Sequence, residues 1–322
     1  MTLSWLRGLL SHRRARIVCT ALGVAVGVAL LASIGTFLSA STSKMTARAS
    51  SGVAVDWQVQ AAKGADPATV LAQVKRFGGV TAALPVAIAD TTGLQASTSG
   101  STQQTGPGKV VGLPDAYART FPGALRTLSG SGSGVLLAQQ TAANLHARPG
   151  DTISIGRTGL AAAKVRVAGV VDLAQADSFF QQVGAPAGAQ PQAPPDNVVL
   201  LPRSTFERIE APVAAVRPDL VVTQVHAALS RSLPGSPSAA YDSVAGHARN
   251  LETTLAGAGL VGDNLGTALD QAREDALYAE LLFLFLGVPG AILAGIVTAS
   301  IASAGAGRRR RDAALLRTRG AS

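Results

Sequence analysis

Two long runs without a charged residue lie near the two ends of the chain, at residues 17–43 and 281–307. Each run contains 27 residues, whereas a helix needs about 20 apolar residues to cross a hydrocarbon core of about 30 Å. The pattern therefore predicts two transmembrane helices, at residues 17–38 and 281–306. The intervening residues 39–262 are numerous enough to bury a hydrophobic core of one or two lobes.

The first part of this middle region has the pattern of a mixed α/β domain. Residues 53–60 alternate between apolar and polar side chains, which predicts a strand. Residues 67–77 predict a helix, with Asp66 as its N-cap and Pro67 at its first position. Residues 79–89 predict a returning strand, and the polar stretch 91–108 predicts a loop or an exposed hairpin.

The second part continues with short elements separated by turn residues. Residues 134–156 predict a strand, a short helix, a Pro-Gly-Asp turn and another strand, and the alternating residues 164–172 predict the hairpin partner of that strand. Residues 184–195, rich in Pro, Gly and Ala, predict a flexible loop. The remaining elements predicted here are a strand at 197–201, a helix at 204–210 and a strand at 220–225.

From Ala240 onward the pattern predicts helix almost without interruption. Its last part before the second apolar run carries an apolar stripe at spacings of three and four, formed by Leu265, Leu269, Ala272, Ala276 and Ala279. We therefore expect an amphipathic stalk helix at residues 263–280 that continues into the second span. Pro289 removes a backbone hydrogen bond inside that span and predicts a kink.

The charge distribution predicts how the chain crosses the membrane. The chain has 28 basic and 19 acidic residues, and the tails 1–16 and 307–322 contain ten of the arginines and only one of the acidic residues, Asp312. Short arginine-rich flanks mark the cytoplasmic side of a membrane, so we expect both termini in the cytoplasm and residues 39–262 outside it, at the plasma membrane. Because the domain itself has no net charge, the basic pI does not indicate nucleic-acid binding.

The first apolar run allows two further interpretations. A cleaved secretory signal is the alternative to a retained span, although the apolar core is longer than the roughly 7 to 15 residues of such signals. Gly23 and Gly27 form a GxxxG pair, which predicts close packing of another helix against this face. The only cysteine, Cys19, lies in the same run, so the outer domain contains no disulfide.

No catalytic motif is recognisable along the chain. The sequence has no GxSxG, HExxH, Walker A or CxxC pattern, and its four histidines are widely separated. The Ser-Gly repeat at 129–134 lacks the Lys-Ser/Thr of a phosphate loop and predicts a flexible turn. The sequence therefore predicts no cofactor, no metal site and no enzymatic activity of the chain itself.

The C-terminal sequence RRRRDAALLRTRGAS, at residues 308–322, is the strongest local signal. Four arginines suffice as a membrane anchor, but the following DAALLRTR has the pattern of a short amphipathic helix. The whole segment resembles the one that follows the second membrane helix of FtsX-like permeases, the membrane subunits of type VII ABC transporters. Segments GVLLAQQTAANLHARPGDTISI and KVRVAGVVD are similar to parts of the MacB-type periplasmic core domain of that family.

This resemblance implies a fold, a function and partners. The fold is a membrane protein with two transmembrane α-helices flanking a mixed α/β extracytoplasmic domain of the MacB-type periplasmic core kind, with a helical stalk. The function is that of a permease subunit, in which a separate ABC ATPase moves the outer domain for export or mechanotransmission. The resemblance implies that the ATPase binds the segment formed by Arg311, Asp312, Ala313, Leu315, Leu316 and Arg317.

Family members continue beyond this point into further membrane helices, so the chain is expected to be a partial permease. Its partners would then be the ATPase, the remaining permease half or a second permease copy, and the lipid bilayer. The transported substrate does not follow from the resemblance. Two alternatives are a two-span sensor with an extracytoplasmic ligand-binding domain and a membrane-anchored outer enzyme.

Overall fold

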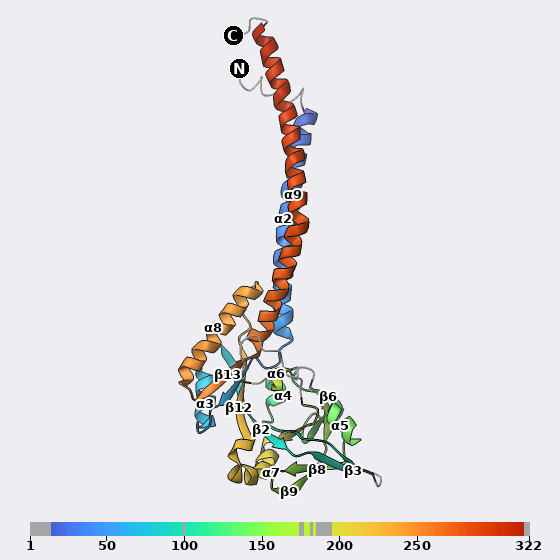
Figure 1. Ribbon diagram of the computed structural model, residues 1–322, viewed down its shortest axis with the longest axis vertical. Helices are drawn as coiled ribbons and strands as arrows, with labels where there is room; N and C mark the ends of the chain where they lie inside the picture. The colour runs from blue at the N-terminus through green and yellow to red at the C-terminus, as the bar shows by residue number, and fades with distance from the viewer. Residues whose placement is uncertain (1–13, 99–100, 174–176, 181–182, 185–194, 319–322) are drawn as a thin grey trace. The chain divides into compact units, whose positions relative to one another are not determined.

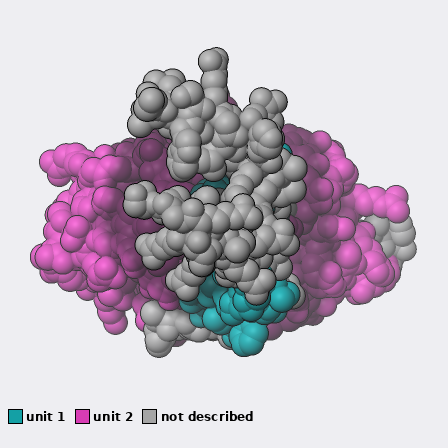
Figure 2. Space-filling model, turned by 90° about the horizontal axis from the view of Figure 1, so that it is seen from above, with its two compact units in different colours: residues 1–45, 274–322 teal, residues 46–273 magenta. Residues whose placement is uncertain are grey.

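The computed structural model describes residues 14–98, 101–173, 177–180, 183–184 and 195–318 (Figure 1). The chain divides into two compact units, which Figure 2 shows in different colours. Unit 2, residues 46–273, contains the β-sheets and their helices, and unit 1, residues 1–45 and 274–322, contains the outer parts of the two longest helices.

Most described strands of unit 2 belong to one large mixed sheet. The neighbouring pairs β5/β11 and β7/β10 are parallel, and all other neighbours in this sheet are antiparallel. Within the described residues its order is β13 (Gly259–Asp263), β1 (Trp57–Ala61), β12 (Val221–Leu229), β2 (Val80–Thr91), β5 (Gly108–Leu113), β11 (Val198–Pro202), β7 (Leu136–Ala138), β10 (Gly169–Asp172) and β6 (Arg126–Gly130).

A smaller antiparallel sheet packs against the large one. Its described strands lie in the order β4 (Ser101–Gln104), β3 (Leu94–Thr98), β8 (Thr152–Arg157) and β9 (Leu160–Arg166). Side chains alternate between the two faces of a strand, and β11 shows the result clearly. Val199 and Leu201 pack in the core that includes Ile153 of the smaller sheet, whereas Val198 and Leu200 pack on the opposite face with Tyr117.

Helices cover the large sheet on several sides. In Figure 1, α3 (Pro67–Arg76) and α8 (Pro237–Leu255) lie together beside β12 and β13. They bury Val70, Val74 and Leu251 against Trp57 and Val59 of β1. The other described helices of this unit are α4 (Tyr117–Thr120), α5 (Gln139–Leu145), α6 (Asp177–Phe180), α7 (Arg203–Val216) and the 3-10 turn η1 (Pro218–Leu220).

Several elements predicted from local patterns are confirmed. Helix α3 begins at Pro67, and the carboxylate of Asp66 accepts hydrogen bonds from the backbone N–H groups of Ala68 and Thr69. Residues 91–108 contain the hairpin of β3 and β4, which was one of the two predicted alternatives. Two predicted elements have different bounds: the strand of 53–60 begins at Trp57, and the helix of 204–210 extends as α7 over 203–216.

The hairpin partner predicted at residues 164–172 is confirmed for its first part, since residues 164–166 pair with β8, but the prediction of one strand over the whole range is wrong. Residues up to Arg166 form β9 of the smaller sheet, and residues from Gly169 form β10 of the large sheet. The chain changes sheets between them, where Val167 N–H donates to Asp151 O and Ala168 N–H donates to Val135 O. No proline or charged residue lies between Arg166 and Asp172 to mark this change, so the local pattern could not reveal it.

The almost uninterrupted helix predicted after Ala240 is also wrong in part. Helix α8 ends at Leu255, Ala256 and Gly257 adopt left-handed backbone angles, and β13 follows before the last helix begins. Residues 259–263 pair with all five residues of β1, which supplies the hydrogen bonds that a helix would otherwise make internally. The loop predicted at 184–195 lies almost entirely outside the described residues.

The two longest helices are α2 (Arg14–Ser51) and α9 (Asn264–Thr318). Helix α9 has no break between Ala272 and Leu281, which confirms the predicted continuity from the stalk into the apolar run. Within unit 1 the rings of Phe37 and Phe283 lie 5.3 Å apart, so the two helices contact each other there. Their other large apolar side chains include exposed ones, such as Phe285 with 81% of its surface accessible.

Candidate functional site

Helix α2 ends and helix α9 begins beside the same strand of unit 2. Strand β1 pairs with β12 on one side and with β13 on the other, and β13 leads directly into α9. We call this region the helix junction. It is formed by Ser50, Val53, Asp56, Trp57, Arg231, Asp263 and Asn264.

Arg231 binds the end of α2 to the strand. Its Nη1 donates to the carbonyl of Ser50 at 2.6 Å, and its Nη2 donates to the carbonyl of Val53 at 2.5 Å and to Asp56 Oδ1 at 3.0 Å. The last carbonyls of a helix have no partner within the helix, and a cation is favourable at this end of the helix dipole. The guanidinium therefore satisfies a helix terminus and a buried carboxylate together.

Asp56 is enclosed on all sides. Its side chain is 1% exposed, and Oδ2 accepts a hydrogen bond from the backbone N–H of Leu229 at 2.8 Å. Burial raises the pKa of Asp56 above its usual value, and the hydrogen bond from Leu229 and the charge of Arg231 oppose this rise. Removing Arg231 would leave a buried carboxylate without its cation, which is strongly unfavourable.

The start of α9 is held by Trp57, which follows Asp56 and is the first residue of β1. Trp57 Nε1 donates to Asp263 Oδ1 at 3.1 Å, and the same oxygen accepts from Gly266 N–H in the first turn of α9 at 2.8 Å. Asp263 is thus the N-cap of α9 and a partner of β1. Burial raises the pKa of Asp263 to about 6; the bonds from Gly266 and Trp57 lower it, and the nearby charge of Asp56 raises it.

Further contacts close the junction from the side of α9. Asn264 Nδ2 donates to Val55 O at 2.9 Å, and Leu265 N–H donates to Asp56 O at 3.2 Å. The same region also contains an apolar cluster, to which the end of α2, α8 and the first turns of α9 contribute. Its buried members are Val53, Ala240, Val244, Leu265 and Leu269.

A second polar group is buried in the centre of unit 2. Tyr117 Oη lies 2.7 Å from His226 Nδ1, and Gln224 Oε1 lies 3.3 Å from His226 Nε2. Burial lowers the pKa of His226 to about 3, so the ring is neutral at physiological pH. Neutral imidazole then accepts from the tyrosine hydroxyl and donates to the glutamine, and the rings of Phe121 and Phe179 enclose it.

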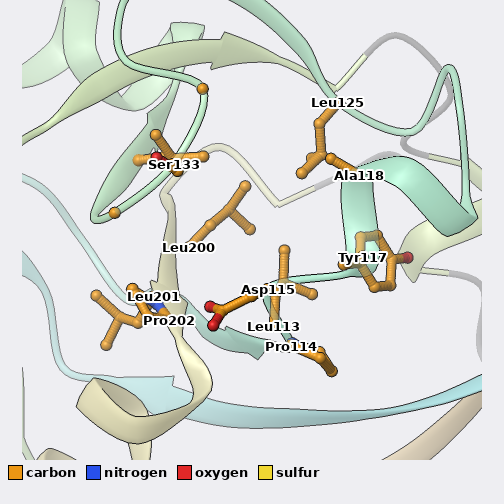
Figure 3. A pocket seen from close by; sticks show the side chains of 13 residues that line it. Leu113, Pro114, Asp115, Tyr117, Ala118, Leu125, Ser133, Leu200, Leu201 and Pro202 are labelled. Carbon is orange, nitrogen blue, oxygen red and sulfur yellow. The ribbon is translucent and has the colours of Figure 1, made fainter.

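Figure 3 shows a small cavity at the ends of the parallel strands β5 and β11. Its walls are mostly apolar, and the carboxylate of Asp115 lies among Leu200, Leu201 and Pro202 in this view. The loop containing Gly132 and Gly134 forms another wall of this cavity. The volume is about 60 Å³, whereas pockets for drug-sized ligands have roughly 300 to 1,000 Å³, so the space fits only a small group.

The residues predicted from sequence lie outside the helix junction. Helix α9 runs through residues 311–317, but the side chains of Arg311, Asp312, Ala313, Leu315, Leu316 and Arg317 are not among those described. Pro289 lies inside α9. No described atom, apart from neighbouring helix backbone, lies within 4 Å of the position that a Cβ would take at Gly23 or Gly27, so the predicted packing of another helix there stays a prediction. The predicted kink at Pro289 also stays a prediction.

The described residues also bear on membrane crossing and on metal binding. One helix segment there, residues 21–51, is long and apolar enough to cross a membrane, and an 18-residue window within it has a mean hydropathy of 2.2. No group of three or more His, Cys, Asp or Glu side chains among the described residues is placed to hold a metal ion.

The sequence patterns missed the residues of the helix junction. Asp263 was recognised only as the start of the stalk, and Asp56, Trp57 and Arg231 were not singled out. Arg231 contacts Ser50 across 181 positions of the chain, and Asp56 contacts Leu229 across 173. The only local signal was an aspartate, Asp263, shortly before the first residue of the apolar stripe, which is typical of an N-cap.

Comparisons with known proteins place the chain in a family. Comparison with curated proteins gives no match. The crystal structure of the periplasmic region of MacB from Actinobacillus actinomycetemcomitans aligns with 70% of this chain and 95% of that chain, at 10% identity and a TM-score of 0.40. The sequence pattern of the MacB-like periplasmic core domain matches residues 17–232, which is well over half of the chain. On this match, the chain belongs to the family of the MacB-like periplasmic core domain.

Proposed function

We propose that the chain is the membrane permease part of an ABC transporter whose ATPase is a separate subunit. The observation that carries this proposal is the family match over residues 17–232, because it includes both the first apolar helix and the α/β domain. Membership indicates a membrane protein with an extracytoplasmic domain. The number of spans and the partner are the parts that we propose.

The proposed topology has two spans, at residues 17–38 and 281–306, with the domain between them outside the cytoplasm. The exposed apolar side chains of unit 1, such as Leu282, Phe285 and Leu293, support contact with lipid, since a water-exposed surface of this kind is unfavourable. The arginine-rich tails support cytoplasmic termini. The exposed face around Gly23 and Gly27 would accept the remaining permease half or a second copy.

The proposed ATPase contact is the segment from Arg311 to Arg317 at the end of α9. Membrane anchoring needs only the preceding arginines, whereas Leu315 and Leu316 add apolar side chains to a charged helix. Movement of this segment by the ATPase would act on α9, which is continuous from Asn264 to Thr318. An unbroken helix can transmit displacement along its axis, and the domain would change its arrangement in response.

Copurification of an ABC ATPase from the cells that naturally produce the protein tests this function. The double variant Leu315→Asp with Leu316→Asp removes apolar contacts worth roughly 1.5 to 3 kcal/mol for each leucine. This loss weakens a micromolar contact by about one to two orders of magnitude or more for each leucine. We expect normal membrane insertion, because the arginine cluster is unchanged, and loss of the copurifying ATPase.

A matched control places the same two charges on another face of the same helix, in the variant Ala314→Asp with Thr318→Asp. We expect this control to retain the ATPase. If the leucine variant inserts normally and still binds the ATPase with unchanged affinity, the segment is only a membrane anchor. If the unaltered chain binds no ATPase, the permease function is wrong and a two-span sensor becomes the better interpretation.

A further inference from the structure

The helix junction joins the two long helices through two consecutive residues, Asp56 directly before β1 and Trp57 at its first position. Asp56 receives Arg231, which also binds the carbonyls of Ser50 and Val53 at the end of α2. Trp57 binds Asp263, which caps the first turn of α9. The end of α2 is therefore connected to Asp56 through Arg231, and the start of α9 is connected to Trp57 through Asp263.

Both sides of the junction depend on hydrogen bonds to a buried carboxylate. On the side of α2 a charged guanidinium meets a buried carboxylate, and bonds of this kind are roughly twice as strong as neutral ones. On the side of α9 the carboxylate of Asp263 accepts from an indole and a backbone N–H group. The peptide group between Asp56 and Trp57 is shared by both sides, and Leu265 N–H of α9 binds the carbonyl of Asp56 directly.

The apolar cluster of the helix junction links the same two helix ends. Val53 follows α2 and is buried together with Leu265 and Leu269 of α9. Packed cores behave as bistable units and do not deform continuously. The polar contacts and the apolar contacts of the junction are therefore expected to form or break together.

We infer that Arg231 and Trp57 are positioning residues that couple the end of α2 to the first turn of α9 through Asp56 and β1. Loosening one helix end lowers the stability of the other, although the hydrogen bonds of the Arg231 side chain within the described residues go to Ser50, Val53 and Asp56 and not to α9. Coupling between two sites is reciprocal, so loosening the start of α9 must affect the end of α2 by the same factor. The use of this coupling to carry movement into the sheet rests on the proposed permease function, but the coupling itself does not.

Hydrogen–deuterium exchange of the full chain in lipid nanodiscs tests the coupling. The variant Arg231→Lys keeps the positive charge beside Asp56 but loses the fork that binds two helix carbonyls. We expect exchange to rise at least threefold in residues 47–53 and, by a comparable factor, in residues 264–269. Exchange in residues 198–202, the buried strand β11, reports global stability and should not change.

Two further variants complete the experiment. Trp57→Phe removes the donor to Asp263, and we expect it to accelerate exchange in the same two segments. Arg217→Lys is the matched control, because Arg217 makes a two-bond contact with Asp219 at the surface of the same unit. This control should leave both segments unchanged.

Two outcomes overturn the inference. In one, Arg231→Lys accelerates only residues 47–53 and Trp57→Phe accelerates only residues 264–269, which shows two independent contacts. In the other, residues 198–202 accelerate by the same factor as both segments in both variants, which shows only global destabilisation. No ATPase takes part, so failure of the copurification experiment leaves this result intact, and the reverse also holds.

Discussion

Trp57 and Asp263 are 206 positions apart in the chain, yet the indole Nε1 donates a 3.1 Å hydrogen bond to the carboxylate. The same carboxylate oxygen caps α9, so one side chain connects strand β1 with the last helix of the chain. Together with the contact of Arg231 to Asp56, this bond places the ends of both long helices on one strand. The first prediction follows from the environment of this carboxylate.

The pH dependence of unfolding should reveal the buried carboxylate of Asp263. Its pKa is about 6 in the folded domain, chiefly because of burial, against 3.8 for an aspartate side chain exposed to water. The folded state therefore binds this proton more tightly than the unfolded state. The contribution of Asp263 to the free energy of unfolding is greatest below about pH 4 and falls by up to about 3 kcal/mol as the pH rises to about 6.

Denaturant unfolding of the chain and of Asp263→Asn between pH 4 and 7 measures this contribution as a difference. The comparison with the variant is necessary because His226 has the opposite sign. Its folded pKa of about 3 lies below the usual histidine value of 6.5, so its contribution to stability is lost as the pH falls through this range. Parallel curves for the two proteins would contradict the assigned burial of Asp263.

Tyr117→Phe should destabilise unit 2 through the unpaired nitrogen of His226. The hydroxyl of Tyr117 is the partner of Nδ1 at 2.7 Å, and both residues are fully buried. A buried acceptor without its donor costs about 1 to 3 kcal/mol. We expect a loss of this size in the free energy of unfolding at pH 7. Phe121→Leu, which alters ring packing but leaves the hydrogen bond, separates the polar effect from the aromatic one.

Two glycine-to-alanine substitutions should have opposite effects on stability. A Cβ at Gly169 would lie 2.0 Å from the carbonyl oxygen of Ser131, so the β6–β10 edge must shift. We expect Gly169→Ala to destabilise unit 2 by about 1 to 3 kcal/mol. Gly246 lies inside α8 with nothing within 4 Å, and Gly246→Ala should stabilise the unit by about 0.5 to 1 kcal/mol. Thermal unfolding of both variants checks the two signs.

Cysteine labelling in intact cells should confirm the proposed topology. Cysteines introduced at Ser4 and Ser322 should react only after the membrane is permeabilised, because the arginine-rich tails favour the cytoplasm. A cysteine at Ser238, an exposed position of the domain, should react with an impermeant reagent without permeabilisation. Labelling of either terminus in intact cells would refute the two-span arrangement.

Part of this protein could be predicted from sequence because the responsible interactions are local. The cap of α3 depends on Asp66 and the next three residues, and the continuity of α9 depends on the lack of a break between Thr267 and Phe285. The apolar composition of α2 is likewise a property of one continuous segment. The resemblance to the MacB-type domain was readable for a similar reason, since ordered short motifs survive in the sequence itself.

Only the tertiary structure determined the path of the chain through the sheets and the composition of the helix junction. Strand β13 exists because β1 offers its edge to residues 259–263, and the change of sheet after Arg166 depends on carbonyls of Asp151 and Val135. Arg231 is an ordinary arginine in sequence, and its role comes from a helix end that lies 181 positions earlier. Hydrogen bonds and burial between distant segments leave no periodicity along the chain, so the fold alone brings these residues together.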